Sequence, residues 1–425
     1  MVRGILALTA GTLLAAVSTQ ALAGGIERGG YNIDLLFDPS RIATDASVTY
    51  VMPERELNNV VDTDTTLPAP LNGLFGVPVG GGGGNLNGRA DNVEETEAFV
   101  VPRFGFKAGL TDDIDCLAQY GEPWGAHTNP GADWAGANSN IETKIDSFSL
   151  EMTCSYKFAV GPGNLRILGG GFYQEIEGFK DRLVISDDVL GAVGIPLSGV
   201  GRLELGDEGA GFRVGAAYEI PDIALRASLV YNSEVELDDI TGVLDLTGLP
   251  LSATNPFAGR VTSVFGEATL PQSVELKLQS GIRPGWLAFG SVKWVDWSVL
   301  QSIEFNSTIA NNITSLDLFY RDGWTVSGGI GHQFNDKLSG SLALTWDRGT
   351  STGLGSQTDT WTVSGGVAYQ PTEMVELRFG GAVGLLTSGS SGQITRDGQV
   401  YGDDVSYDFD DDIVSAVSGA LKVKF

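Results

Sequence analysis

Cysteine, histidine and basic residues are all scarce in this chain of 425 residues. Two cysteines cannot form a disulfide-dense scaffold or a four-cysteine zinc site, and two histidines leave little for metal binding or a catalytic triad. Only 26 lysines and arginines face 53 aspartates and glutamates, so the formal net charge is −27, which argues against binding to nucleic acid. The residues therefore predict no enzyme, no metal site and no cofactor.

Long hydrophobic runs are also missing after the first segment of the chain. Residues 1–23 have a basic start, an apolar centre and two small residues near their end, Ala21 and Ala23, which is typical of a secretory signal peptide cleaved before Gly24. Beyond Gly24 no stretch approaches the roughly 20 apolar residues that a spanning helix needs. These features indicate an exported protein, either a periplasmic soluble protein or an outer-membrane barrel.

Alternation between apolar and polar residues is what the chain has in abundance. It is unbroken in 273–279, and it recurs in 148–157 and 223–231, which is the pattern of β-strands with one apolar face. Several stretches reach the roughly 9 to 11 residues that cross a bilayer at a tilt, whereas strands of soluble proteins average about five or six. A spanning sheet must close on itself, because lipid cannot satisfy an open edge. We therefore expect an all-β transmembrane antiparallel barrel.

About fourteen strands can be placed, an even number as in single-chain bacterial barrels. They lie near residues 46–58, 97–110, 114–128, 141–158, 164–180, 210–220, 222–237, 267–283, 286–304, 320–333, 337–347, 358–370, 373–386 and 413–425. Short turns, expected in the periplasm, alternate with long connections, expected outside the cell, around 181–209, 238–266, 305–319, 348–357 and 387–412.

The last strand carries its own signal. Residues 417–425 alternate between apolar and polar, and the strand ends on the aromatic Phe425. Outer-membrane barrels commonly end in this way, and the strand resembles the signal that the barrel-assembly machinery recognises. We expect that machinery to be a partner of the chain.

Several segments, in this order along the chain, carry a family resemblance. They are Phe99-Val100-Val101-Pro102-Arg103-Phe104-Gly105-Phe106 before the turn Thr111-Asp112-Asp113, Gln119-Tyr120-Gly121, 141–157, Tyr231-Asn232-Ser233-Glu234-Val235, Leu270-Pro271 and Trp294-Val295-Asp296-Trp297-Ser298. Together they resemble the FadL/TodX family of outer-membrane transporters for long-chain fatty acids and other hydrophobic compounds. The resemblance covers most of the chain after residue 24.

The resemblance implies a function and a domain organisation. Members of the family are fourteen-stranded barrels plugged by an N-terminal hatch, and they take up ligand between outer loops and release it at a kink in the third strand. It implies a hatch over residues 24–45 and a barrel over 46–425. The expected function is passive uptake of hydrophobic small molecules, above all long-chain fatty acids, by a monomer in the bacterial outer membrane.

Two short motifs are the candidates for the gate. The best counterpart of the family's hatch motif, Asn-Pro-Ala, is Asp38-Pro39-Ser40, which keeps only the proline. Gly121-Glu122-Pro123 falls inside the third strand, where a proline cannot donate to the ladder. The motif predicts the kink, with an ordinary bulge as the alternative.

Two sets of residues are candidate ligand contacts. Cations on the polar strand faces should point into the lumen, where they could bind a fatty carboxylate or pair with Glu219, Glu275 and Glu376; they are Arg213, Arg226, Lys277, Lys293 and Arg378. Apolar residues in two long loops could capture the ligand or pack on one another; they are Leu190, Val193, Ile195, Leu249 and Leu251.

Two further features concern the compartment of the protein. Cys116 and Cys154 should lie on adjacent strands, and an exported chain meets an oxidising environment, so a structural disulfide between them is possible. The acidic loop 403–412 could hold divalent cations that bridge to lipopolysaccharide, or could simply be solvated.

Four alternative functions stay open at this point, one of them adhesion through the outer loops. A general or structural porin would share the barrel, but it would need a wide aqueous lumen. An aromatic-hydrocarbon channel would share the family and differ in its ligand. A membrane-embedded hydrolase would need a nucleophile beside His127 or His332, and the sequence shows no such constellation.

Overall fold

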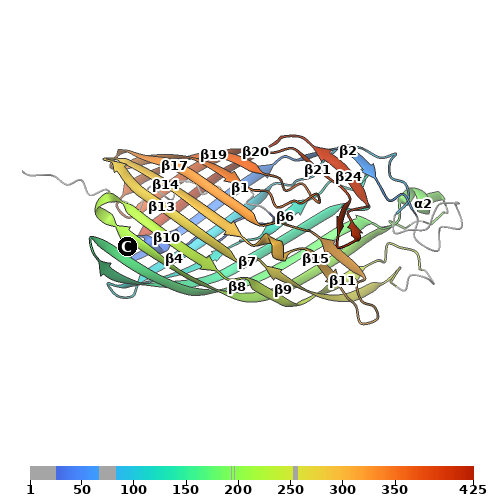
Figure 1. Cartoon of the computed structure of the whole chain (residues 1–425), viewed down its shortest axis with the longest axis horizontal. Coiled ribbons are helices and arrows are strands. Elements are labelled where there is room, and N and C mark those ends of the chain that lie inside the picture. Colours follow the sequence, from blue (N-terminus) through green and yellow to red (C-terminus); the bar gives the residue numbers. More distant parts are fainter. Residues whose placement is uncertain (1–24, 67–82, 193, 196, 252–256) are drawn as a thin grey trace, which may run out of the picture.

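The computed structural model describes residues 25–66, 83–192, 194–195, 197–251 and 257–425. Most of these residues form one antiparallel sheet that curls into a barrel (Figure 1). Strand β25 (Asp412–Lys424) pairs with β1 (Ile42–Pro53), and β1 pairs in turn with β4 (Phe99–Gly109). This pairing closes the wall, and the prediction of a fourteen-stranded antiparallel barrel is confirmed.

Three of the fourteen wall strands are interrupted, so they are counted as pairs of segments. After β1 and β4 the wall continues through β5 (Ile114–Gly121) with β6 (Gly125–Thr128), β7 (Glu142–Val160), β8 (Gly163–Leu183), β9 (Val200–Ile220), β10 (Leu225–Asn232) with β11 (Val235–Asp245), β12 (Val261–Leu270) with β13 (Ser273–Arg283), β14 (Trp286–Val295), β17 (Gly323–Asn335), β18 (Leu338–Asp347), β19 (Thr360–Thr372), β20 (Val375–Leu386) and β25.

The two ends of the barrel differ. Short connections lie at one end, which we call the turn end and which is on the left in Figure 1; long connections lie at the other, which we call the loop end. The loop end carries the small elements β2 (Glu56–Asp62), β3 (Val93–Glu94), α2 (Asp187–Ala192), β15 (Ser302–Phe305), β16 (Thr314–Asp317), β21 (Gly389–Ser391), β22 (Ile394–Arg396), β23 (Gln399–Tyr401) and β24 (Val405–Phe409). Short helical turns are η1 (Asp34–Phe37), η2 (Pro221–Ile223) and η3 (Trp297–Val299).

Several element bounds differ from those expected. The first wall strand begins at Ile42 instead of residue 46, because Ala43 already pairs with Lys424. The loops expected over 181–209 and 238–266 are shorter, because cross-strand pairing continues to Leu183 and Val200 in one and to Asp245 and Val261 in the other. The strand expected over 286–304 ends at Val295, where the chain turns into η3.

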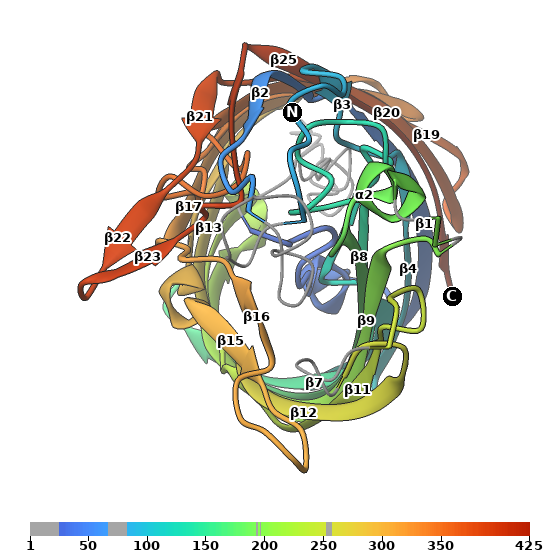
Figure 2. The ribbon, with the colours of Figure 1, turned by 90° about the vertical axis from the view of Figure 1, so that its right-hand side faces the viewer.

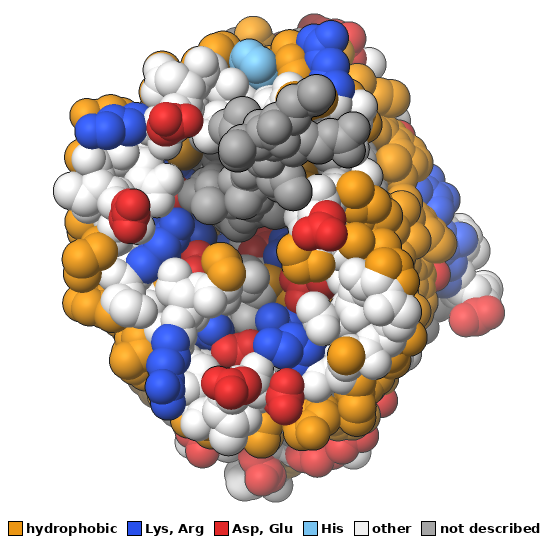
Figure 3. Space-filling view, turned by 90° about the vertical axis from the view of Figure 1, so that its left-hand side faces the viewer, with side chains coloured by type: hydrophobic (Ala, Val, Ile, Leu, Met, Phe, Trp, Pro, Cys, Tyr) orange, Lys and Arg blue, Asp and Glu red, His pale blue; other side chains and the backbone are white. Residues whose placement is uncertain are grey.

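The wall is apolar outside and polar inside. Leu278, Val326 and Phe379 are among the large apolar side chains exposed on the outer face, whereas Arg213 and Lys293 are buried on the inner face. At the turn end, charged side chains are visible in the hollow of the barrel, inside a rim rich in hydrophobic residues (Figure 3). Side chains that alternate in this way fit a wall in contact with lipid and a polar lumen. Among the described residues no helix is long and apolar enough to cross a membrane.

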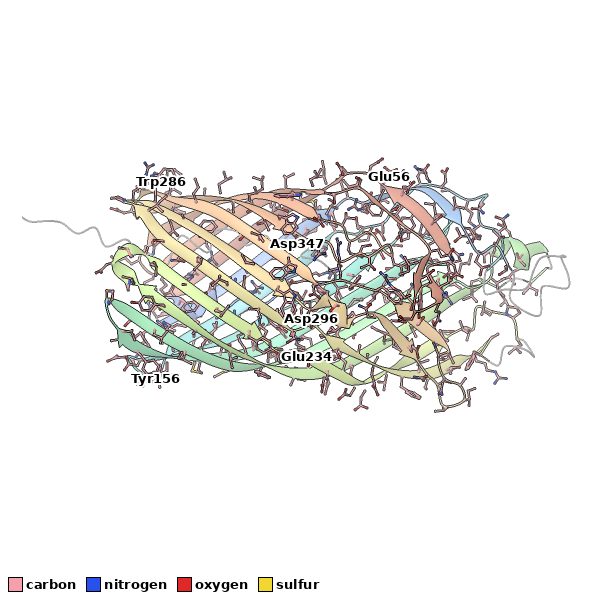
Figure 4. The ribbon with its side chains drawn as sticks, in the orientation of Figure 1. Glu56, Tyr156, Glu234, Trp286, Asp296 and Asp347 are labelled. Atoms are coloured by element: carbon pink, nitrogen blue, oxygen red, sulfur yellow. A yellow bond between two sulfur atoms is a disulfide. The ribbon has the colours of Figure 1, made fainter. Side chains whose placement is uncertain are left out.

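Two further features lie toward the turn end of the barrel. Tyr156 and Trp286 sit at this end, where aromatic residues suit a membrane interface (Figure 4). Cys116 of β5 lies directly opposite Cys154 of β7, with 4.0 Å between their Cα atoms, and their sulfur atoms are bonded. The disulfide links the third wall strand to the fourth, on the turn-end side of the interruption in the third strand.

Substitution of adjacent residues that face opposite sides of β1 should distinguish lipid from lumen. Val48 is exposed on the outer face, whereas Thr49 lines a cavity inside the barrel. We expect Val48→Lys to lower the free energy of unfolding in lipid vesicles by about 2–4 kcal/mol, because a charge enters the bilayer. Thr49→Lys should lower the free energy of unfolding clearly less in the same denaturant titration. Equal losses would contradict the assignment of the two faces.

Candidate functional site

The chain before β1 lies inside the barrel. Figure 2 looks along the barrel from the loop end, and the blue start of the described chain runs within the ring of strands. We call residues 25–41 the N-terminal segment. Its apolar side chains pack on inward-facing residues of the wall and form a buried cluster with them, which comprises Ile33, Leu35, Leu36, Phe37, Ala43, Leu117, Leu168, Ala217 and Val230. Apolar burial therefore anchors η1 at this level of the lumen.

Ion pairs anchor the same segment. Asp34 lies between two barrel cations, with its carboxylate 3.2 Å from Lys277 Nζ and 3.7 Å from Arg226 Nη2. Asp38 accepts from Lys422 at 3.2 Å, and the fully buried Glu27 pairs with Lys293. A buried charge is costly without a partner, so each of these carboxylates binds the segment to a particular strand.

The pKa values of two of these carboxyl groups are lowered. Burial opposes the ionisation of Asp34, but the charges of Lys277 and Arg226 outweigh it and bring the pKa of Asp34 below the ordinary value of 3.8. Burial likewise opposes the ionisation of Asp38, and Lys422 together with the N–H group of Ser40 lowers its pKa. Both groups are therefore carboxylates at neutral pH.

The third wall strand is broken where the N-terminal segment meets it. Strand β5 ends at Gly121 and β6 begins at Gly125. In the interval the carbonyl group of Glu122 accepts from Gly29 N at 3.1 Å, and that of Pro123 accepts from Arg28 N at 3.0 Å and Gly30 N at 3.3 Å. We call residues 122–124 the strand break. The segment satisfies backbone groups that the wall leaves unpaired at this point.

Glycine is required on one side of this contact. A Cβ atom on Gly29 would lie only 2.5 Å from the carbonyl oxygen of Glu122, so a side chain would push the segment away from the strand break. The backbone of the segment can approach the wall closely only because Gly29 has no side chain.

A chain of aromatic rings links the strand break to the loop end. Trp124 packs edge-on against Trp297 of η3, with ring centroids 5.4 Å apart, and against Tyr31 of the N-terminal segment at 6.0 Å. Trp297 continues to Tyr320, and Tyr31 continues to Phe172 of β8. These rings belong to the largest buried apolar cluster, which extends into β9, β11, β12 and β15. A continuous band of apolar side chains therefore runs inside the barrel from η3, after β14, to the strand break.

Two cavities lie on the other side of the N-terminal segment. The first is lined by the segment and by β1, β4 and β25, and its walls include Leu35, Val51 and Val101. The second lies nearer the loop end, beside Phe99 and the chain around Ser356. Arg28 is the one residue that lines both cavities among those described. The two cavities and the strand break therefore meet at one stretch of the N-terminal segment.

A comparison with known proteins identifies the family. Residues 36–340 match the model of the outer membrane protein transport protein family (OMPP1/FadL/TodX). The chain belongs to this family. Its relatives include the long-chain fatty acid transport protein of Escherichia coli K12, which is 21% identical over 285 residues, or 61% of this chain and 63% of that protein. The chain thus aligns with less than two thirds of the length of that relative.

Solved structures show the same fold at low sequence identity. A FadL homologue from Pseudomonas aeruginosa matches with a TM-score of 0.70 at 15% identity, covering 97% of this chain and 99% of that one. The toluene transporter TodX of Pseudomonas putida matches with a TM-score of 0.59 at 14% identity, covering 95% and 96%. Family membership and the barrel fold together support a location in an outer membrane.

The five cations predicted as ligand contacts all face the lumen, and each has a carboxylate beside it. Lys293 pairs with Glu27, Arg226 and Lys277 with Asp34, Arg378 with Asp45, and Arg213 with Glu151 at 2.9 Å. Of the carboxylates named in advance, Glu275 pairs with Lys277 at 3.6 Å and Glu376 with Arg378 at 3.9 Å, as expected, whereas Glu219 binds Arg166. The geometry thus gives these cations a partner within the protein.

The predicted gate motifs are not brought together. The carbonyl groups of Asp38 and Ser40 accept from Lys107 Nζ at 3.0 and 2.7 Å, toward the turn end, while Pro39 is exposed. The residues against the strand break are instead 26–30. Gly121 is the last residue of β5, and Glu122 and Pro123 lie within the strand break.

The predicted loop residues divide into two groups. Leu190 and Leu249 are buried together with Ile185, Leu246 and Ala258, and Ile195 packs against that cluster. Leu251 is 77% exposed, whereas Val193 lies outside the described residues. The signal peptide predicted over 1–23 also lies outside them. Most of this apolar surface therefore packs within the loops.

Sequence reasoning did not find the residues at the centre of the site. Arg28, Gly29, Tyr31 and Trp124 were not singled out, although Gly29-Gly30 and the tryptophan after Pro123 were visible, and Trp297 was named only within a segment that carries the family resemblance. Among the described residues no group of histidine, cysteine, aspartate or glutamate side chains is arranged to hold a metal ion.

The anchoring of the N-terminal segment should depend on pH in one direction. Because the native pKa values of Asp34 and Asp38 lie below 3.8, their ion pairs stabilise the segment fully above that pH, and the stabilisation is lost as the pH falls through the native values. A nitroxide on Asn32→Cys should therefore give an immobile EPR spectrum at about pH 5–7 and a growing mobile component below about pH 3.8.

Variants separate this effect from general acid unfolding. Asp34→Asn in the same spin-labelled background should show the mobile component already at neutral pH, because the segment loses the carboxylate that pairs with Lys277 and Arg226. Asp112→Asn, in an exposed turn, should behave like the parent protein. If Asp34→Asn left the spectrum immobile at every pH, these ion pairs would not anchor the segment.

Proposed function

We propose that this protein carries hydrophobic small molecules, above all long-chain fatty acids, passively across the bacterial outer membrane. The loop end faces outward and takes up the ligand. The ligand then passes along the band of apolar side chains inside the barrel to the strand break and leaves there. The turn end then faces the periplasm. The family model and the relatives described as long-chain fatty acid transport proteins support the proposed transport of hydrophobic molecules.

One observation carries the proposal: the strand break is covered from inside by a separate piece of chain. Its backbone contacts run to Arg28, Gly29 and Gly30, so movement of that segment would open the wall without breaking a wall strand elsewhere. Buried aromatic rings and the cavity at Arg28 reach the same place. A ligand that avoids water can follow this route from the loops to the lipid-facing wall.

Aromatic hydrocarbons are the second candidate class of ligand. TodX, described as a toluene transporter, has the same fold, and an uncharged ring needs only the apolar part of the route. A wide aqueous porin is less consistent with this lumen, because the N-terminal segment lies inside it (Figure 2). A hydrolase has little support, because the hydrogen bonds described for His127 and His332 go to Glu142 and to a backbone carbonyl group and not to a hydroxyl or thiol nucleophile.

Uptake of radiolabelled oleate by cells with and without this protein tests the proposal, with toluene and a small sugar measured in parallel. We expect uptake of oleate to depend on the protein and uptake of the sugar not to. Dependence for toluene alone would change the ligand class. Dependence for the sugar alone would contradict the proposal and support a porin.

Replacement of two prolines tests the strand break itself. Pro123→Ala restores an N–H group where the third strand is interrupted, so the strand can pair more continuously and uptake of oleate should fall several-fold. Pro102→Ala changes a proline within the continuous strand β4 and is the matched control, with uptake unchanged. Equal uptake by both variants and the parent would show that transport does not depend on the strand break.

A further inference from the structure

Arg28 is buried between the N-terminal segment and the wall, and only part of its guanidinium group has a partner. The side chain is 5% exposed, and its Cζ atom lies 4.4 Å from the ring centre of Phe99. Nη1 is 3.4 Å from a carboxylate oxygen of Asp146, which also pairs with Lys144 at 2.7 Å. Neither Nε nor Nη2 has a hydrogen-bond partner among the described residues.

The two free nitrogens form one edge of the guanidinium group. Nε–H and Nη2–H point in parallel, and their spacing matches the two oxygens of a carboxylate, which is the usual bidentate pairing of arginine. A buried donor without an acceptor is costly, and here two such donors lie side by side. Burial also lowers the pKa of Arg28, and the carboxylates of Asp146 and Glu122 only partly oppose this effect.

The surroundings of Arg28 suit an anion with a hydrophobic tail. Arg28 lines both cavities, and the walls of the deeper one include Leu35, Val51 and Val101. Arg103 lines the same cavity and donates to the carbonyl groups of Gly29 and Gly30, so it adds positive charge. Among the described residues Arg103 has no carboxylate within ion-pair distance.

Several other lumenal cations are already held by carboxylates of the protein. Lys277 and Arg226 share Asp34, Arg213 binds Glu151, and Arg166 binds both Asp115 and Glu219 at 2.6 Å. A ligand carboxylate at these positions would have to compete with a carboxylate of the protein. At the Nε–Nη2 edge of Arg28 it would meet two unoccupied donors instead.

We propose that Arg28 binds the carboxylate of the transported ligand through Nε and Nη2, and so selects single-chain fatty acids over uncharged hydrocarbons of the same length. This inference rests on the proposed function and names its ligand class and binding group. The hydrocarbon chain of the ligand then lies in the deeper cavity against its apolar residues, among them Leu35, Val51 and Val101, while charged residues of the N-terminal segment and the wall line the rest of that cavity. Because Arg28 belongs to the N-terminal segment, the ligand is held next to the strand break.

Equilibrium binding of radiolabelled oleate and methyl oleate to the purified protein in detergent micelles tests this proposal. Arg28→Gln should weaken oleate binding by about tenfold or more, the effect of losing a charge-assisted pair, and change methyl oleate binding less than about twofold. Arg28→Lys should be intermediate, because an ammonium group keeps the charge without the paired donors. Arg166→Gln, which removes a fully paired lumenal guanidinium group, should leave both affinities unchanged.

A second variant covers the case in which Arg28→Gln fails to fold. A Cβ atom on Gly125 would lie 2.7 Å from Nε and Cδ of Arg28, so Gly125→Ala displaces the guanidinium group and keeps its charge. It too should weaken oleate binding selectively.

Three results would overturn the inference. An unchanged oleate affinity in Arg28→Gln and Gly125→Ala would show that Arg28 binds no ligand. Equal losses for oleate and methyl oleate would show that Arg28 only supports the structure. If the unmodified protein bound neither compound, the proposed function itself would fail, and this inference would fail with it.

Discussion

The hydrogen bonds from Arg28, Gly29 and Gly30 to the carbonyl groups of Glu122 and Pro123 are the contact on which the lumenal structure depends. A barrel wall in lipid cannot leave backbone groups unpaired, so a strand that is interrupted needs partners from elsewhere. Here those partners come from a segment that is folded inside the barrel and held by apolar packing and by ion pairs. The strand break and the N-terminal segment are therefore one structural unit. Trp124 and Trp297 connect that unit to the loop after β14.

The arrangement of charge inside the barrel follows from the cost of burying ions. Many lumenal arginines and lysines are matched by carboxylates, although Arg103 is not, and several of those carboxylates belong to the N-terminal segment. The same ion pairs therefore neutralise charge in the lumen and position the segment. Arg28 departs from this pattern, because one edge of its guanidinium group has no acceptor. The overall charge of −27 is compatible with such a lumen, since it describes the whole chain and not the route of the ligand.

The wall of the barrel could be predicted from the sequence, and much of the site could not. A period of two is a local property, so the strands, their number and the interruption at Pro123 follow from neighbouring residues. Pairing across the lumen is not local. Asp34 binds Lys277, which is 243 positions away, and no pattern in the sequence predicts that contact. The first strand begins earlier than expected because its register is set by β25, at the far end of the chain. Leu190 and Leu249 were expected as exposed ligand contacts or as packed loop residues, and only the folded loops distinguish the two.

Photocrosslinking with a fatty acid that carries a diazirine near the end of its chain tests the proposed route most directly. After irradiation of membranes that contain the protein, modified peptides would be mapped by mass spectrometry and compared with those from membranes given excess unlabelled oleate. The account predicts displaceable modification within residues 26–37, 99–105 and 120–126, around the strand break and the deeper cavity. Modification restricted to the outer, lipid-facing side chains and unaffected by oleate would contradict the route.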